Sequence, residues 1–477
     1  MSNATSAQRK SETHLDTLVI GGGPGGTPAA MVLAAAGRKV MLVEAGQGLG
    51  GTCLFEGCIP SKIYRETARR RLEAADAAEF GLAVAGAIPS VDWHQVQARR
   101  HRILTMRSQG ALMNARQLPG LQVVFGRARL IGPRSAVVES PGMPARTVSF
   151  DTAILATGSV PSRLLIPGCD LPGVLDSSGL IRIGFIPKSL VLIGGGPIGV
   201  EMAQIFSMLG AEVVILEAAP RILGPVDPVL AGMLTETMRA ERIRIETGVA
   251  VERIDAEEDG HVVTFSRDGR SEGIRAQSVA IVAGRHPAVE GLGLETTAVV
   301  HDRHGVKVSD ALETNEPGIY ATGDLVGHPM FAHWATAQAR AVAGHILGRP
   351  APYPQPAHNS AVIFSSPEIG MAGLTEEAAR AAGEDVAVAE YDYRIDARAQ
   401  IAGAAMGRLR LIYRRTDHRV LGVHAMVEGV ADVIGEAAMA VHNGLTLEQI
   451  ATSIHPHPTL TESFGIAALT TLAQLRG

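Results

Sequence analysis

Two of the three cysteines in this 477-residue chain, Cys53 and Cys58, are separated by only four residues. In an ideal helix, residues at this spacing have Cα atoms roughly 8.6 Å apart, whereas a disulfide tolerates at most about 7 Å. A bridge would therefore need irregular backbone, which Gly57 and Pro60 favour because glycine is conformationally permissive and proline removes a helical donor. Because a bridge on distorted backbone is easily reduced, the pair suggests a redox centre.

Two other interpretations of this pair stay open on spacing alone. Zinc ligands usually occur as C-x2-C with a second pair or with histidines, and no such partner pair is present. Two unrelated core cysteines are the other alternative. Lys62 follows Cys58 by four residues, and a cation one helical turn away favours a thiolate. This neighbour favours the redox interpretation.

Length and composition restrict the class of protein. The chain is too long for one hydrophobic core and predicts about two to four domains. Its net charge of −5, without a long basic run, argues against nucleic acid as the main partner. Three cysteines do not make a secreted disulfide framework, and no apolar run reaches the length of about 18 residues that a membrane span needs. We expect a cytoplasmic protein with no membrane partner and a disordered tail over residues 1–14.

Residues 17–44 have the pattern of a dinucleotide-binding unit: a strand, a glycine-rich turn, a helix and a second strand that ends in an acid. Gly21 allows the tight turn, Gly23 lets a pyrophosphate approach a helix N-terminus, and Gly26 permits close helix–strand packing. Glu44 follows Gly21 by 23 residues and can accept a ribose hydroxyl. We call Gly21–Gly26 the first fingerprint.

The same pattern recurs over residues 189–217, where the glycines are Gly194, Gly196 and Gly199 and the acid is Glu217. Two complete fingerprints predict two dinucleotides on two doubly wound α/β domains, although a duplicated domain with one inactive site is an alternative. A carboxylate at Glu217 can bond a 2′-hydroxyl and would repel a 2′-phosphate, which favours NAD over NADP. We call Gly194–Gly199 the second fingerprint.

The sequence after the proline-rich residues 350–356 predicts a different architecture. Residues 407–413 and 419–426 are expected to form an antiparallel hairpin, and a helix over 431–442 should end at Gly444. Segregated strands and helices are typical of an α+β domain.

Residues 50–62, GGTCLFEGCIPSK, resemble the redox motif of the flavin-dependent pyridine nucleotide-disulfide oxidoreductases, and residues 126–128, 156–161 and 318–324 resemble flavin motifs of the same family. The resemblance covers roughly residues 15 to 465. It implies an α/β fold with two Rossmann-like dinucleotide-binding domains, for FAD and NAD, plus a C-terminal α+β dimerisation domain. The domain limits that we expect are 15–158 for FAD, 159–284 for NAD, 285–356 for a central segment completing the FAD domain, and 357–477 for dimerisation.

The resemblance also implies the residues of each cofactor site, and it implies no metal. For FAD these are Gly21, Gly23, Gly26, Glu44, Thr52, Lys62, Ala128, Thr157, Gly158, Asp324, Met330, Ala332 and His333. For NAD they are Gly194, Gly196, Ile198, Gly199, Glu201, Glu217, Val251 and Gly284. Within these sets, Asp324 is expected to hold the ribityl chain, and Lys62 is expected to pair with Glu201.

Two histidines alternate with prolines over residues 454–462, a pattern that could also bind a metal. By resemblance to the family's HxHPTLxE pattern, His457 acts as the acid–base group and Glu462 orients its ring and raises its basicity. The family supplies this loop from the second subunit. A homodimer with active sites shared across its interface is therefore implied.

Within the family, the chain is most similar to the dihydrolipoamide dehydrogenases. No cysteine follows Cys169, which argues against mercuric and large thioredoxin reductases, and the complete cysteine pair argues against transhydrogenases. Residues Phe55, Glu56 and Trp334 depart from the usual pattern. The resemblance implies dihydrolipoamide oxidation with NAD, in partnership with lipoyl domains of a 2-oxo acid dehydrogenase or glycine cleavage complex. An NAD(P)H-dependent reductase of another small disulfide and a mainly structural assembly subunit are the alternatives.

Overall fold

The computed structural model describes residues 13–83, 89–349 and 352–476. Residues 1–12 of the predicted tail and residues 350–351 of the proline-rich segment 350–356 lie outside the described residues. Thr13 and His14 already belong to the first strand, so the prediction that the tail extends to residue 14 is wrong for these two residues. Their backbone is fixed by a parallel ladder, in which Thr13 faces Val148 and His14 faces Ser149.

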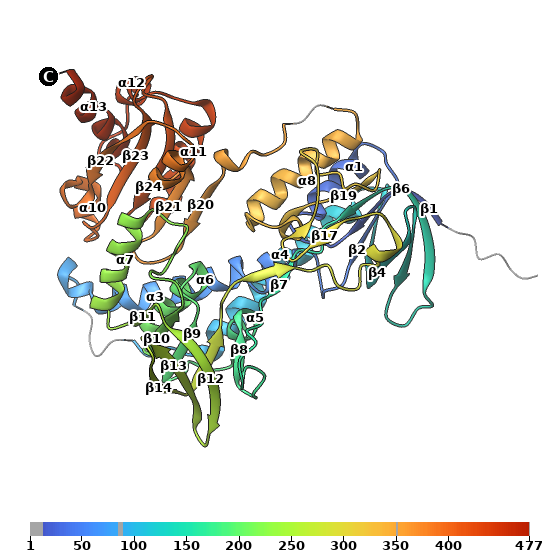
Figure 1. Cartoon of the computed structure of the whole chain (residues 1–477), viewed down its shortest axis with the longest axis horizontal. Helices are drawn as coiled ribbons and strands as arrows, with labels where there is room; N and C mark the ends of the chain where they lie inside the picture. The colour runs from blue at the N-terminus through green and yellow to red at the C-terminus, as the bar shows by residue number, and fades with distance from the viewer. Residues whose placement is uncertain (1–12, 84–88, 350–351, 477) are drawn as a thin grey trace, which may run out of the picture. The chain divides into compact units, whose positions relative to one another are not determined.

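The chain forms two compact units, each assembled from three segments (Figure 1). The first unit comprises residues 1–60, 98–160 and 285–354, and the second comprises residues 61–97, 161–284 and 355–477. The chain thus changes units after Pro60, Gln97, Val160, Gly284 and Pro354. The last three changes lie close to the predicted limits at 158, 284 and 356, whereas the first two fall inside the predicted FAD domain. The predicted functional boundaries themselves stay a prediction.

A seven-stranded sheet organises the first unit, in the order β3-β2-β1-β6-β5-β4 with β19 beside β6. Strands β1, β2, β3, β6 and β19 run parallel, and β4 and β5 pair antiparallel. Apolar strand residues are buried against the helices on this sheet, as expected for a doubly wound domain. The bounds are β1 Thr13–Ile20, α1 Thr27–Ala35, β2 Val40–Glu44, α4 Trp93–Arg116, β3 Leu121–Phe125, β4 Arg127–Gly132, β5 Ser135–Glu139, β6 Arg146–Leu155, β19 Ile319–Ala321 and α8 Ala332–Ile346.

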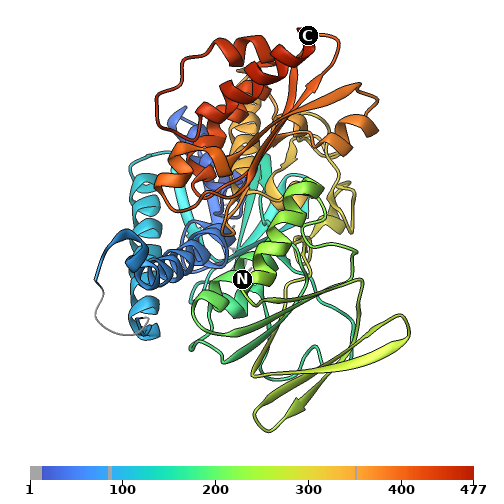
Figure 2. The same ribbon diagram turned by 90° about the vertical axis from the view of Figure 1, so that its left-hand side faces the viewer.

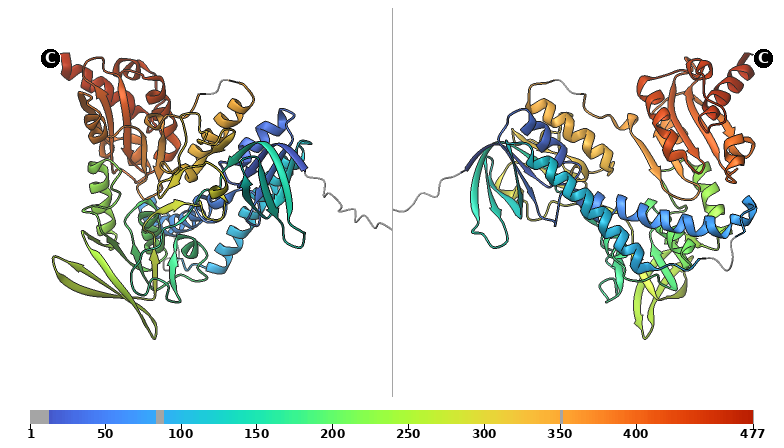
Figure 3. Two further views of the ribbon diagram at one scale, coloured as in Figure 1. Left: turned by 45° about the vertical axis from the view of Figure 1, so that its right-hand side comes forward. Right: turned by 180° about the vertical axis from the view of Figure 1, so that it is seen from behind.

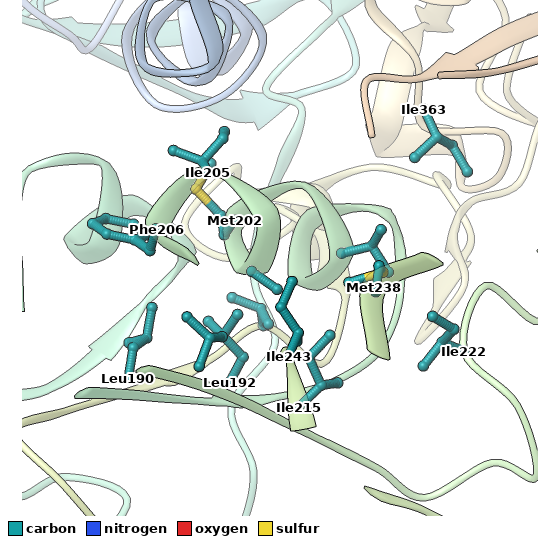
Figure 4. Packing of buried hydrophobic residues seen from close by; sticks show 14 of the residues in the cluster. Leu190, Leu192, Met202, Ile205, Phe206, Ile215, Ile222, Met238, Ile243 and Ile363 are labelled. Atoms are coloured by element: carbon teal, nitrogen blue, oxygen red, sulfur yellow. The ribbon is translucent and has the colours of Figure 1, made fainter. Parts of the chain in front are cut away.

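A five-stranded parallel sheet, β11-β10-β9-β15-β8, forms the second α/β region, in the second unit. Figure 4 shows Met202 and Phe206 of α6 packed over Leu190 and Leu192 of β9. A three-stranded antiparallel sheet, β12-β13-β14, adjoins this region (Figure 2, yellow-green). The bounds are β8 Val174–Asp176, α5 Ser177–Ile181, β9 Ser189–Ile193, α6 Pro197–Met208, β10 Glu212–Glu217, α7 Pro228–Ala240, β11 Arg244–Thr247, β12 Ala250–Glu257, β13 Gly260–Arg267, β14 Arg270–Ala276 and β15 Ser278–Ile281.

The C-terminal part of the second unit is an antiparallel sheet, β20-β21-β24-β23-β22, on which α11 and α13 pack (Figure 3, red and orange). The predicted hairpin and α+β pattern are confirmed, and α11 ends at Gly444 in a left-handed conformation (φ 62°). The bounds are β20 Ser360–Ile363, β21 Ile369–Gly373, α9 Glu376–Ala381, β22 Val386–Asp392, α10 Ala397–Ile401, β23 Arg408–Arg414, β24 Val420–Met426, α11 Val430–Asn443, α12 Leu447–Thr452 and α13 Glu462–Arg476.

Across the described ranges, no helix has both the length and the apolar character needed to cross a membrane. Short strands and 3-10 turns complete the two units. They are the strands β7 Ser159–Pro161, β16 Arg285–Pro287, β17 His301–Asp302 and β18 Gly305–Val306, and the 3-10 turns η1 Ala77–Phe80, η2 Leu294–Thr296, η3 Gly323–Val326, η4 Pro356–His358 and η5 Tyr393–Ile395.

Candidate active site and cofactor sites

The two cysteines lie on either side of a break between two helices. Cys53 lies in α2 (Gly51–Phe55), and Cys58 begins α3 (Cys58–Ala75). Glu56 ends α2 with φ −134° and ψ 5°, so the predicted irregular backbone is confirmed. A Cβ added to Gly57 would lie 3.4 Å from the Thr52 carbonyl oxygen, an ordinary van der Waals contact. Cys53 is half-buried and Cys58 is exposed.

The turn before Cys53 rests on the first fingerprint. Gly50 has φ 131° and donates its N–H to the Gly22 carbonyl at 2.9 Å. Gly51 has φ 56°, and its hydrogen points at Gly23, since a Cβ there would lie 2.8 Å from the Gly23 Cα. These glycines bring the start of α2, which carries Cys53, against the turn that is predicted to bind a pyrophosphate.

The backbone geometry of Gly21 and Gly26 agrees with the tight turn and the close packing expected of them. Gly21 has φ 111°, and a side chain there would collide with the Ala156 carbonyl at 2.2 Å. A Cβ on Gly26 would lie 1.9 Å from the Gly21 carbonyl oxygen, so only glycine permits this helix–strand approach. The Glu44 carboxylate accepts the N–H of Gly22 at 2.6 Å and that of Gly46 at 2.5 Å, which holds it at the edge of the turn.

Asp324 is held by two residues that the sequence analysis did not assign to the site. The Ser159 hydroxyl donates to Asp324 Oδ2 at 2.6 Å, and Arg285 Nε donates to the same hydroxyl oxygen at 2.7 Å. Arg285 also donates to the Ser159 carbonyl at 2.7 Å. The only signal in the sequence was indirect, because Ser159 lies in the quoted segment 156–161 and Arg285 directly follows Gly284.

Three further polar contacts assemble the first site from distant segments. Thr157 Oγ1 donates to the Ala288 carbonyl at 2.8 Å, and Gly158 has φ 73°. Thr322 Oγ1 donates to the Gly25 carbonyl at 3.1 Å, and Thr336 Oγ1 of α8 donates to the Pro24 carbonyl at 3.3 Å. The first fingerprint is therefore bonded both to the flavin motif at residues 318–324 and to α8.

The remaining residues predicted for FAD also lie in the first unit, except for Lys62. Ala128 is buried in β4, and Thr52 is half-buried in α2. Met330 and Ala332 are half-buried at the start of α8, whereas His333 is exposed and stacks on Phe331 with ring centroids 5.3 Å apart.

The second fingerprint reproduces the geometry of the first. Gly194 has φ 122°, and a Cβ on Gly199 would lie 2.0 Å from the Gly194 carbonyl oxygen. Glu217 accepts the N–H of Gly195 at 2.6 Å and that of Ala219 at 2.7 Å. This carboxylate is thus fixed at the edge of the turn, as Glu44 is at the first fingerprint.

The other residues predicted for NAD surround this turn in the second unit. Ile198 lies in the first turn of α6, and Gly284 has φ 104°. Val251 in β12 follows a turn whose Val249 N–H donates to the Glu217 carbonyl at 3.2 Å. Arg221, a nearby cation, donates to the Gly224 carbonyl at 2.6 Å and lies 3.5 Å from Glu377.

Lys62 and Glu201 form the pair that the resemblance implied. Lys62 Nζ donates to Glu201 Oε2 at 2.8 Å and lies 4.3 Å from the centroid of the Phe364 ring. Glu201 is 8% exposed, and its Oε1 accepts the Phe364 N–H at 3.0 Å. The ammonium on the helix that begins with Cys58 is thus held in place by a carboxylate and an aromatic face.

The C-terminal histidines have separate carboxylate partners. His457 Nδ1 lies 3.0 and 3.1 Å from the two Glu462 oxygens, and its side chain is 72% exposed. His455 Nε2 lies 2.7 Å from Glu436 Oε1 and is largely buried. The Thr459 N–H, and then the His457 ring, lower the pKa of Glu462. An ionised Glu462 can therefore hold Nδ1–H and leave Nε2 of His457 open to a substrate.

Metal binding finds no support in the part of the chain that the structure describes, where no group of three or more histidine, cysteine, aspartate or glutamate side chains could hold an ion. The two histidines of the C-terminal loop contact different glutamates. The acid–base interpretation of this loop therefore fits its geometry better than the metal alternative.

Comparison with known proteins agrees with this arrangement. Residues 15–339 match the family described as pyridine nucleotide-disulphide oxidoreductase, and residues 359–468 match its dimerisation domain. A dihydrolipoyl dehydrogenase from Geobacillus stearothermophilus is 34% identical, with 94% of each chain covered. One from Pseudomonas aeruginosa is 36% identical, covering 95% of this chain and 97% of the relative.

A solved structure is also similar over nearly the whole chain. It is a Cu(II) complex of the HOCl-induced flavoprotein disulfide reductase RclA from Escherichia coli, with a TM-score of 0.86 and 27% identity, covering 96% of this chain and 99% of that one. The α/β fold with a C-terminal dimerisation domain is confirmed.

FAD and NAD are the cofactors of this family, and the described residues fit both. At Gly23 a Cβ would come no closer than 3.7 Å to any described atom, and at Gly196 nothing described lies within 4 Å. Each fingerprint thus presents bare backbone at a helix N-terminus, as a pyrophosphate requires. The chain therefore belongs to the pyridine nucleotide-disulphide oxidoreductase family.

Proposed function

We propose that the protein is a dihydrolipoyl dehydrogenase that oxidises dihydrolipoamide to lipoamide and passes the electrons to NAD. The observation that carries this proposal is the His457–Glu462 pair at 3.0 Å, in a chain that also has the Cys53–Cys58 redox motif. The relatives named above support the choice of substrate. Glu217, fixed by two backbone N–H groups, supports NAD rather than NADP.

Thiol–disulfide exchange is the chemistry assigned to the cysteines. His457 takes the proton of one substrate thiol on Nε2, and the resulting thiolate attacks Sγ of Cys53, forming a mixed disulfide and releasing Cys58 as a thiolate. The second substrate thiol then attacks the substrate sulfur of the mixed disulfide and passes its proton to the leaving Cys53 sulfur, which releases lipoamide and the Cys53 thiol. Two electrons are thereby stored as the Cys53–Cys58 dithiol, and Lys62 favours the charged form of Cys58.

FAD, when bound, accepts these two electrons and delivers a hydride equivalent to NAD. Asp324, held by Ser159 and Arg285, would bond the ribityl chain. Glu44 would bond a ribose hydroxyl of FAD, and Glu217 one of NAD. The two bare glycine turns would receive the pyrophosphates.

We further propose that His457 of the partner subunit serves the cysteines of each chain. The match of residues 359–468 to a dimerisation domain supports a homodimer. The 72% exposed ring of His457 is free to meet a group outside its own chain. Lipoyl domains of a multienzyme complex are the proposed partners, and a cytoplasmic location is supported by the low cysteine content.

The decisive experiment removes the base and then restores it by subunit mixing. His457→Ala should slow dihydrolipoamide oxidation by at least about 10²-fold, because general-base catalysis typically contributes about 10²- to 10⁴-fold. NADH oxidation with artificial acceptors should remain, since it requires no thiol deprotonation. His301→Ala, an exposed histidine on β17, is the matched control and should behave as wild type.

Heterodimers of His457→Ala and Cys53→Ser subunits test the shared site. Each heterodimer would contain one site with both groups intact, so up to half of the wild-type activity should return. Purified heterodimers without activity would show that each chain supplies its own base.

A second candidate is a disulfide reductase that runs in the opposite direction, and the likeness to RclA supports it. Steady-state assays with dihydrolipoamide and NAD, and with oxidised glutathione and NADH or NADPH, separate the two functions. A higher kcat/KM for disulfide reduction than for dihydrolipoamide oxidation would favour the second.

A further inference from the structure

A strained loop, residues 221–227, contacts the backbone of the second fingerprint. The Leu223 N–H donates to the Gly195 carbonyl at 2.9 Å, and Ile222 Cγ2 lies 2.6 Å from where a Cβ on Gly195 would be. Leu223 has φ 54°, a left-handed conformation that is rare for a bulky residue, and it is 1% exposed. Such strain persists only where the surroundings hold the backbone in place.

The loop ends at Asp227, which is fully buried and caps α7. Its Oδ1 accepts the N–H groups of Val229 at 3.0 Å and Leu230 at 3.3 Å. Its Oδ2 faces Arg410 Nε at 3.1 Å, without the geometry of a hydrogen bond, so the attraction is that of an ion pair. One carboxylate thus joins the loop, α7 and a cation from another sheet.

Arg410 belongs to β23 of the dimerisation domain, and its side chain is 8% exposed. Besides Asp227, it donates to Glu376 at 2.6 Å and to Glu390 at 2.5 Å. A buried carboxylate that loses its cation partner is strongly unfavourable. The position of the loop at Asp227 therefore depends on a residue of the dimerisation domain.

We propose that Arg410 is a positioning residue for the nicotinamide dinucleotide. Its ion pair with Asp227 fixes the loop 221–227. Leu223 of this loop in turn fixes the Gly195 carbonyl of the second fingerprint. The dimerisation domain thereby sets the shape of the NAD-binding turn. The inference rests on the proposed function only in taking NAD as the ligand of this turn.

The test compares Arg410→Met with Arg410→Lys in the purified holoenzyme dimer. Arg410→Met keeps the length of the side chain but removes its charge. It should raise both the Kd and the KM for NAD by about fivefold to tenfold, since residues coupled in one network interact on this scale. The KM for dihydrolipoamide and the flavin content should not change. Arg410→Lys should restore most of the NAD affinity.

Arg394→Met is the matched control, because Arg394 forms an exposed ion pair with Asp392 in the same domain. It should leave the NAD affinity unchanged. Asp227→Asn provides a second variant if Arg410→Met does not fold, because asparagine still caps α7 while the ion pair is lost. It should weaken NAD binding in the same direction.

A merely structural role would lower the thermal midpoint of Arg410→Met and leave the Kd for NAD unchanged, and that result would overturn the proposal. So would a wild-type enzyme that does not bind NAD. Direct titration with NAD requires no thiol substrate. Wild-type protein that binds NAD but does not oxidise dihydrolipoamide would refute the proposed function and leave this inference standing.

Discussion

The two dinucleotide turns are built alike but enclosed differently. In both, the first glycine has a left-handed φ, and a Cβ on the last glycine would lie 1.9 or 2.0 Å from the carbonyl oxygen of the first. In both, a glutamate accepts the N–H of the second glycine at 2.6 Å. The first turn is covered by Gly51 of the redox segment and bonded by Thr322 and Thr336. At Gly196 of the second turn, a Cβ would meet no described atom within 4 Å.

We expect this difference to separate a cofactor that stays bound from one that must exchange. A turn held by three distant segments favours slow release of its ligand. The second turn is held by the Leu223–Gly195 hydrogen bond and is uncovered at Gly196, so we expect NAD to enter and leave it at each turnover. Local sequence thus specifies the ability to bind a dinucleotide, whereas the surrounding segments specify how long it stays.

The largest effect is expected from two matched glycine variants, of which only Gly26→Ala should lose its flavin. Gly26→Ala and Gly199→Ala each place a Cβ 1.9 or 2.0 Å from a carbonyl oxygen, an overlap that no rotamer relieves. We expect Gly26→Ala to purify without FAD and without any activity. Gly199→Ala should stay yellow but lose at least about tenfold in NAD affinity, consistent with a cost of about 1–3 kcal/mol for overpacking.

Absorbance spectra measure the flavin content of both variants, and titrations measure their affinity for NAD. If Gly199→Ala also lost its flavin, the two turns would not be independent and the comparison above would fail.

A smaller change is expected in nicotinamide preference. Glu217→Arg replaces the acceptor of a 2′-hydroxyl with a cation that can bind a 2′-phosphate, so the NAD/NADP ratio of kcat/KM should fall by roughly ten- to hundredfold. Glu212→Arg, at the exposed start of the same strand, should leave the ratio unchanged. An unchanged ratio in Glu217→Arg would show that the carboxylate does not face the adenosine ribose.

Removing the hydrogen bond that holds Asp324 should weaken FAD binding by a smaller amount. Ser159→Ala removes the hydroxyl between Arg285 and Asp324, and the loss of one hydrogen bond is worth about 0.5–1.5 kcal/mol. We expect FAD to dissociate about twofold to tenfold faster in dilution experiments followed by fluorescence. Ser271→Ala, an exposed serine of β14, serves as the control, and equal rates in both variants would remove Ser159 from the site.

The smallest effect concerns acid stability of the second unit. His424 is 1% exposed, and burial lowers its pKa, so the folded protein holds it neutral while an unfolded chain would protonate it near pH 6.5. Its contribution to stability is present above about pH 6.5 and is lost as the pH falls below that value. His424→Gln should therefore reduce the fall in thermal midpoint between pH 7.5 and 5.5. A fall as large as in wild type would assign the acid sensitivity to other groups.

Sequence alone determined the features that depend on neighbours along the chain. A left-handed turn needs glycine at Gly21 or Gly194 because a Cβ would collide with the backbone. The helix break between the cysteines and the hairpin before α11 follow from similarly local geometry. The resemblance added the Lys62–Glu201 and His457–Glu462 pairs, which local patterns do not specify.

Tertiary structure alone decided the contacts that join distant segments. The polar start of β1 was assigned to a tail because its neighbours gave no strand signal, yet pairing with residues 148–149 of β6 fixes it as a strand. Ser159 and Arg285 lie in or beside quoted motifs, but no motif places them next to Asp324. Arg410 beside Asp227 has no motif signal at all. Such pairs form because folding buries charges and hydroxyls that must find partners, and which partner each one finds depends on how the sheets and helices pack.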